Sequence, residues 1–212
     1  DIGDGLLVAS LVPKLIPGLA DVKQLSVSPY SGTASPVHTC GVRMNGQAFC
    51  WGNNSDGQLG DGTQNSARAP VAVLGPTDAG ITDALEITAG GSHACARRTS
   101  GLFCWGFSAR TGDGTVERRL HAVAVNTTDA VDQIEAGGDM TLARTTDGGM
   151  ICWGRQGRGQ CGDSKPFVVG QDTLLSPAKS TLGNVSFFST GSFHTCAYQA
   201  STTVTWCWGA ND

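Results

Sequence analysis

The sequence predicts an all-β fold of short antiparallel strands, and three observations predict it. A set of landmarks recurs about every fifty residues, short segments alternate apolar and polar side chains, and no segment of about ten residues has the spacing of an amphipathic helix. Glycine accounts for 30 of the 212 residues, against a usual share of roughly 7%. Such a composition favours tight turns between strands over helix surfaces.

The repeat has three landmarks in a fixed order. The middle landmark, Cys-Trp-Gly, occurs four times, with its tryptophan at Trp51, Trp105, Trp153 and Trp208. Ahead of it lies His-Thr-Cys or a variant, which begins at 38, 93, 140 and 194. Behind it lie Gly-Gln-Leu-Gly-Asp-Gly-Thr at 57–63, Thr-Gly-Asp-Gly-Thr at 111–115 and Gly-Gln-Cys-Gly-Asp-Ser at 159–164. We therefore expect a single repeat domain, 1–212, with approximate repeats 1–56, 57–110, 111–158 and 159–212.

One repeat illustrates the expected strands. Residues 84–88 alternate apolar and polar side chains, as a strand with one buried face does, and a Gly-Gly turn follows. We expect further strands at 93–97, 102–105 and 120–125, with the Gly-Asp-Gly-Thr turn before the last of them. Each repeat is thus predicted to hold four short strands.

Residues 38–74 hold the fullest copy of the pattern: His-Thr-Cys, a hairpin, Cys-Trp-Gly-Asn, Gly-Gln-Leu-Gly-Asp-Gly-Thr and Pro-Val-Ala-Val. This combination closely resembles the regulator of chromosome condensation repeat in its Cys-rich secreted form, and the resemblance covers essentially the whole chain. It implies a β-propeller in which each repeat supplies one blade of four antiparallel strands. Members of that family usually have more blades than this chain has repeats.

The two ends of the sequence match parts of one loop in the fullest copy. When both are set against residues 51–62, Asp1 to Gly5 continue where Trp208 to Asp212 break off, with about two residues missing between them. Exposed edge strands are templates for association, so the edges must be closed or paired. Three arrangements stay open: a four-bladed ring, several copies joined as a ring or filament, and a stretch of a longer polypeptide.

The cysteines predict disulfide bridges. Eight cysteines, an even number, favour an oxidising compartment, so we expect an extracellular or secreted protein. A hairpin with Asn45-Gly46 at its tip places Cys40 opposite Cys50, and the same count pairs Cys95 with Cys104 across a loop at 99 and 100. Cys196 with Cys207 fits a longer loop around 201 and 202.

The third repeat departs from this pattern. Leu142 occupies the first cysteine position and leaves Cys152 without its usual partner, while Cys161 stands where the first repeat has Leu59. Loss and gain within one repeat suggest a compensating bridge from Cys152 to Cys161.

Metal and cofactor sites are not predicted. Zinc sites use close Cys-x-x-Cys or Cys/His pairs that converge from two segments. No Cys-x-x-Cys occurs here, and although His38, His93 and His194 each lie two residues before a cysteine, each would need further ligands from another repeat. A calcium loop around Gly57 fails because Gly52 and Thr63 stand where ligands are required. The Gly-Asp-Gly-Thr turns are better explained by glycines at positive φ and an aspartate that closes the turn. His38, His93 and His194 are interpreted as a structural hydrogen-bonding position, because an active site seldom recurs in every repeat.

Two further side-chain types invite a functional interpretation. The four repeated tryptophans are predicted to pack in the core or between blades first and to form sugar platforms only second, while Trp206 lies outside the pattern and could be exposed. Asn53, Asn126 and Asn184 begin Asn-x-Ser/Thr triplets in expected loops and are candidate glycosylation sites.

Charge limits the choice of partner. Lys plus Arg total 14 and Asp plus Glu total 18, so the net charge is −4, the wrong sign for holding phosphate backbones. No segment approaches the roughly 18 apolar residues of a membrane span. We therefore expect neither nucleic acid nor membrane insertion.

The leading hypothesis is a non-catalytic binding or assembly module that contacts a protein partner or further copies of itself. A polysaccharide-binding or polysaccharide-cleaving protein is the first alternative. It would use polar residues that break the periodicity, namely Arg97, Arg98, Glu117, Arg118, Arg119, His121 and Asp139. An inhibitor or exchange-factor-like protein that binds its partner on one propeller face is the second alternative, although paired cysteines argue against a reducing compartment.

Overall fold

The computed structural model describes residues 2–6, 10–29, 37–164 and 172–211. Asp1 and Asp212, which enter the comparison of the two ends, lie outside these residues. All regular structure in the described part is β-strand, so the predicted all-β class is confirmed. The described residues contain no helix that could cross a bilayer.

The strands form four antiparallel sheets, which we call blades 1 to 4 in chain order. Blade 1 holds β1 (Val22–Val27), β2 (His38–Arg43), β3 (Ala48–Gly52) and β4 (Ala67–Ala72). Blade 2 holds β5 (Ala84–Ala89), β6 (His93–Arg98), β7 (Gly101–Gly106) and β8 (Arg119–Ala124). Blade 3 holds β9 (Val131–Ala136), β10 (Met140–Thr145), β11 (Met150–Arg155) and β12 (Thr173–Lys179). Blade 4 holds β13 (Phe187–Thr190), β14 (His194–Gln199) and β15 (Val204–Gly209).

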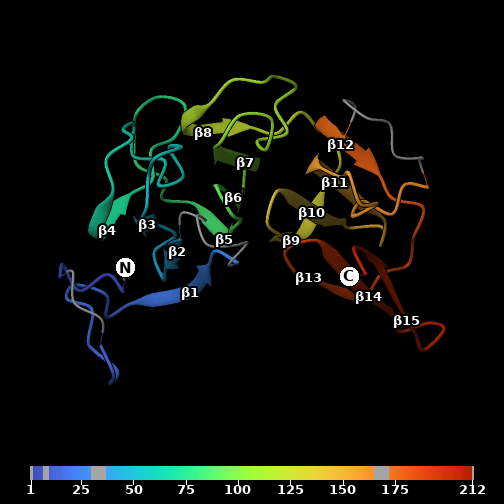
Figure 1. Ribbon diagram of the computed structural model, residues 1–212, viewed down its shortest axis with the longest axis horizontal. Coiled ribbons are helices and arrows are strands. Elements are labelled where there is room, and N and C mark those ends of the chain that lie inside the picture. Colours follow the sequence, from blue (N-terminus) through green and yellow to red (C-terminus); the bar gives the residue numbers. More distant parts are fainter. Residues whose placement is uncertain (1, 7–9, 30–36, 165–171, 212) are drawn as a thin grey trace.

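The blades follow one another along an open arc, as Figure 1 shows. In each blade the strands are ordered as in the sequence, and the first strands of successive blades contact each other. Each predicted repeat begins one strand earlier than the corresponding sheet, because it includes the last strand of the preceding blade. The division of the sequence into these repeats remains a prediction. Blade 4 has three strands, because no described segment pairs with the outer edge of β15.

The hairpin registers agree with the sequence count. Cys40 lies opposite Cys50 and Val42 opposite Ala48, which leaves Met44 to Gly46 as the loop. Arg98 pairs with Gly101 in the second blade, so its loop is the predicted pair of residues, 99 and 100. Gly46 has a φ of 83°, the left-handed conformation that a tight hairpin turn needs.

The apolar core lies between blades rather than within one sheet. Three clusters fill the three junctions. The junction of blades 1 and 2 contains Leu59, Ile87 and Trp105, and the next contains Ile134 and Trp153. The junction of blades 3 and 4 contains Leu142, Cys161 and Phe188. Each blade therefore depends on its neighbours for the burial of its apolar faces.

Candidate functional site

The cysteines form four disulfides within blades. The structure joins Cys40 to Cys50, Cys95 to Cys104 and Cys196 to Cys207, with Cα–Cα distances of 4.0, 4.0 and 4.1 Å. These are the three hairpin pairs that the sequence predicts. Cys152 joins Cys161 with a Cα–Cα distance of 5.7 Å, so this bridge ties β11 to the loop that follows it. The described residues include no free cysteine.

The repeated tryptophans seal the junctions between blades. A glycine of each Gly-Asp turn lies against the indole of the next blade, so that a Cβ on Gly60 would come within 2.7 Å of Trp105. Gly112 and Gly162 meet Trp153 and Trp208 in the same way. Packing between blades, the first of the two predicted roles, is therefore the observed one.

Two of these indoles also hydrogen-bond across the junction. Trp105 Nε1 donates to the Gln58 carbonyl at 2.9 Å, and Trp208 Nε1 donates to the Gln160 carbonyl at 2.7 Å. The buried Nε1 atoms of Trp51 and Trp153 have no partner among the described residues. The four equivalent positions thus differ in one hydrogen bond.

The repeated histidines differ in exposure according to their neighbours. His93 is fully buried, and its Nε2 lies 2.8 Å from Thr141 Oγ1 of the next blade. Burial, reinforced by the charges of Arg110 and His38, lowers the pKa of His93 to about 3. His194 occupies the same position in blade 4 and is exposed, because no described blade follows it. The His93 contact supports the hydrogen-bonding interpretation at that position.

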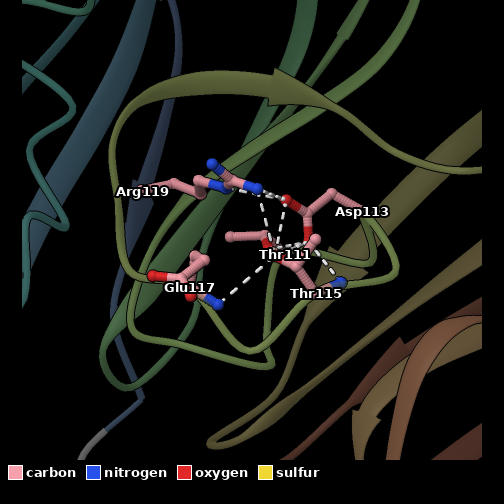
Figure 2. Close-up of polar contacts among 5 residues, drawn as sticks. All are labelled: Thr111, Asp113, Thr115, Glu117 and Arg119. Atoms are coloured by element: carbon pink, nitrogen blue, oxygen red, sulfur yellow. Dashed lines mark hydrogen bonds and ion pairs between the residues drawn. The ribbon is translucent and has the colours of Figure 1, made fainter.

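The Gly-Asp-Gly-Thr turns close on their own aspartate. Asp113 Oδ1 accepts hydrogen bonds from the Thr115 N–H and the Thr111 hydroxyl, both at 3.1 Å, and its Oδ2 accepts from Arg119 Nε at 2.7 Å. Figure 2 shows side chains of the loop between β7 and β8 converging with Arg119, the first residue of β8. Burial acts to raise the pKa of Asp113, but the bonds from Thr115 and Arg119 outweigh it and hold the pKa below its ordinary value. Gly112 and Gly114 both have positive φ, 69° and 86°, as the turn interpretation requires.

The polar residues that break the periodicity do not gather at one place. They form separate pairs instead: Arg97 with Glu86, Arg98 with Asp83, Arg118 with Asp56, Arg119 with Asp113, His121 with Asp78, and Asp139 with Arg110. Glu117 donates its backbone N–H to Thr115 at the edge of the same turn. Among the described residues, no three of the types His, Cys, Asp and Glu come together as a metal site would require.

Sequence reasoning missed a ladder of polar side chains on the first strands of blades 1 to 3. Gln24 Oε1 accepts from the Ile87 N–H at 2.9 Å, and Ser26 Oγ accepts from the Ala89 N–H at 2.9 Å. Between blades 2 and 3, Thr88 Oγ1 accepts from the Ala136 N–H at 2.8 Å. The sequence carries a signal for this ladder: β1, β5 and β9 each have polar residues at two alternating positions, and β13 does not.

Glu86 belongs to this ladder and accepts from the Ile134 N–H at 3.3 Å. Burial raises the pKa of Glu86, although Arg97 and the Ile134 N–H act against it. Burial likewise raises the pKa of Glu135, which accepts a hydrogen bond from Ser189 at 2.9 Å. These carboxyl groups hold blades together rather than face an open cavity.

The arc of described residues has two flanks beside which no described blade lies. We call the free side of blade 1, with Leu25, Val27 and Val37, the N-terminal flank; Val27 is 62% exposed, whereas the equivalent Ala89 and Ala136 are buried. We call the free side of blade 4, with Phe187, Ser189 and His194, the C-terminal flank; Phe187 is 60% exposed. An apolar groove of about 650 Å³ runs along the N-terminal flank. Such exposed apolar surfaces are typical of contact sites.

Comparison with known families agrees with the fold and the repeated contacts. Two models of the regulator of chromosome condensation (RCC1) repeat match the chain, at residues 45–97 and 131–160. The chain is an RCC1-repeat β-propeller protein. The four disulfides fit the Cys-rich form of the repeat.

Known relatives extend well beyond this RCC1-repeat chain. The human probable E3 ubiquitin-protein ligase HERC6 is 30% identical over 91% of the chain, which spans 19% of that protein. Among solved structures, yeast RCC1 (Prp20) bound to Kap60 gives a TM-score of 0.69 at 22% identity and covers 93% of this chain and 45% of its own. Human WBSCR16 gives a TM-score of 0.70 at 19% identity over 89% of this chain and 47% of its own. At these identities the two structures show a common fold.

Proposed function

We propose that this RCC1-repeat chain is an extracellular, non-catalytic protein-binding module whose contact surfaces are its two flanks. The observation that carries the proposal is the contrast between junctions and flanks. Ile87 and Ala89 are buried at an internal junction. Leu25 and Val27 occupy the equivalent positions at the N-terminal flank and are exposed. Removal of such apolar area from water is the main driving force for protein association.

The extracellular assignment rests on the disulfides. One bridge in each blade is typical of an oxidising compartment and rare in the cytosol. Thiol titration of the native protein under denaturing, non-reducing conditions tests it. We expect no reactive thiol, and eight free thiols would overturn the assignment.

A protein partner is favoured over a glycan or a reaction substrate. The N-terminal flank is apolar, whereas arginines that could act on a substrate are paired with separate carboxylates. A structural relative also supports a protein partner, because the study of Prp20p from Saccharomyces cerevisiae describes its binding to Gsp1p and histones. HERC6 is named as a ubiquitin ligase, but the matching region is a fifth of its length, so we assign no ligase activity here.

Cross-linking in the native medium, followed by mass spectrometry, tests the binding function. We expect cross-links from Lys14, which lines the groove of the N-terminal flank, to peptides of a protein. Lys179, on the outermost strand of blade 3, is the internal control and should give few. Turnover of a polysaccharide by the purified chain, with no protein cross-link, would overturn the proposal in favour of the glycan alternative.

Glycosylation is proposed at two of the three candidate asparagines. Asn126 and Asn184 are exposed, whereas Asn53 is half-buried and its Oδ1 accepts from Gln58 Nε2 at 2.9 Å. Expression in a glycosylating secretory host, followed by enzymatic removal of N-glycans, should change the mass of the peptides that contain Asn126 and Asn184. An unchanged mass for both would refute this part.

A further inference from the structure

Glu135 on β9 departs from the polar ladder that joins the first strands of the blades. Ser26 and Thr88 occupy one position of this ladder, and each accepts a backbone N–H of the next blade through a neutral hydroxyl. Both lie opposite the first cysteine of their blade, and Glu135 lies opposite Leu142, which takes the place of that cysteine. Its carboxyl accepts the N–H of Thr190 on β13, which is the equivalent bond between blades 3 and 4. The third junction therefore uses a titratable group where the first two use neutral ones.

The charged groups around Glu135 do not neutralise it. Glu86 on β5 is the charge that acts on Glu135, and it pairs with Arg97 of β6 at 3.1 Å. The other titratable or charged side chains on the strands that pack against β9 have partners elsewhere: His93 with Thr141, Arg98 with Asp83, and Arg144 with Asp132. The strand β13 carries no such side chain. Glu135 itself forms no ion pair within the described part of the chain, so it brings a half-buried negative charge to the junction.

Burial is the main cause that raises the pKa of Glu135 above its ordinary value of 4.5. The hydrogen bonds from Ser189 and Thr190 favour the charged form and act against this rise, while the negative charge of Glu86 adds to it. When the junction opens, the same carboxyl is exposed to water and its pKa returns to the ordinary value. A proton therefore binds the closed junction more tightly than the open one.

Glu135 can take up a proton without the loss of either hydrogen bond. In the charged form, its Oε1 accepts from the Ser189 hydroxyl at 2.9 Å, and the carboxylate also accepts from the Thr190 N–H. A hydroxyl both donates and accepts, so in the protonated form the new carboxyl O–H donates to Ser189 Oγ while the other carboxyl oxygen keeps the Thr190 N–H. The hydrogen of the exposed Ser189 hydroxyl then turns to solvent. A proton taken from water thus removes the cost of a buried charge and the repulsion from Glu86.

We propose that Glu135 is a proton-sensitive contact, which tightens the junction of blades 3 and 4 in a mildly acidic medium and loosens it in a neutral one. Its stabilising contribution is complete below the ordinary pKa of the carboxyl and is lost as the pH rises through the raised pKa. The effect opposes that of His93, whose lowered pKa weakens the fold in acid, so variants must be compared at the same pH to isolate it. This inference goes beyond the proposed binding function and does not depend on it.

Amide hydrogen exchange of the oxidised 212-residue chain, followed by NMR, tests the proposal with the variant E135Q. The amide of this variant is neutral at every pH and has the shape of the protonated carboxyl, with an oxygen for the Thr190 N–H and an NH2 group for Ser189 Oγ. At about pH 4 we expect equal protection of the Thr190 N–H in wild type and E135Q. At about pH 7 we expect stronger protection in E135Q, by about tenfold for each pH unit that separates the raised pKa from the ordinary value. E117Q makes the same change at an exposed glutamate and should match the wild type at both pH values.

A second measurement follows the proton itself. The titration of the Glu135 carboxyl carbon, recorded by NMR, should have its midpoint above pH 4.5 in the wild type and at a lower pH in E86Q, which removes the neighbouring negative charge. A wild-type midpoint at or below pH 4.5 overturns the inference. So does a ratio of Thr190 protection between E135Q and wild type that is the same at both pH values. An E117Q chain that reproduces the E135Q difference overturns it as well, because the effect would then not come from this junction.

Discussion

Replacement of Trp105 and Trp153 by phenylalanine measures what the hydrogen bond between blades contributes. Both indoles are fully buried at equivalent junctions, so each variant loses a similar apolar area. W105F also removes the bond to the Gln58 carbonyl, a net loss of about 1 kcal/mol, whereas W153F removes a buried N–H that has no partner among the described residues and whose burial costs about 1–3 kcal/mol. W105F should therefore be less stable than W153F by about 2–4 kcal/mol.

Thermal unfolding of the oxidised protein, followed by circular dichroism, reads this difference. For a chain of this length, 1 kcal/mol corresponds to about 2–4 °C in Tm, so the two variants should differ by about 4–16 °C. Equal Tm values, or a lower Tm for W153F, would refute the assignment of the interblade bond. The four disulfides are intact in both variants, which makes them matched controls for each other.

Three other predictions follow from burial and pairing. His93 has a pKa of about 3 in the folded chain and an ordinary value when unfolded, so the unfolded state binds the extra proton between these two pH values. Urea unfolding should show stability falling below about pH 6.5 by up to about 1.4 kcal/mol per pH unit, and H93Q should reduce this slope. D113A should lower the free energy of unfolding by about 1–3 kcal/mol at neutral pH, and no loss would contradict the account of the turn. The double variant C152A/C161A removes a bridge across a sequence separation of 9. If the bridge stabilises the fold by restricting the unfolded chain, urea unfolding should show a loss of about 2.5–3 kcal/mol, and a loss near zero would contradict this entropic role.

Local chemistry is the part of this fold that the sequence predicts well. The hairpin registers around Cys40 and Cys95 follow from counting residues back from a glycine turn, because each residue added to a strand pairs with one on its partner. The Asp113 turn follows from the residue types alone, since aspartate and threonine bond to the backbone nearby.

Contacts between blades were harder to predict, because they join residues that lie about fifty positions apart. Gln24 and Ser26 look like the solvent-facing half of an alternating strand, and only the structure shows them bonded to the next blade. The unequal exposure of His93 and His194 has the same origin, since the two share a motif and differ only in what lies beside them. The arrangement of the ends also depends on such contacts, which is why three arrangements stayed open.

The glycine-to-tryptophan contact has a direction along the chain. Gly60 of blade 1 receives Trp105 of blade 2, and Gly162 of blade 3 receives Trp208 of blade 4, so the receiving surface always precedes the indole in sequence. During synthesis from the N-terminus, each new blade finds its docking platform already made. We therefore expect vectorial folding, in which a nascent chain acquires protease resistance one blade at a time as it leaves the ribosome or a translocation pore.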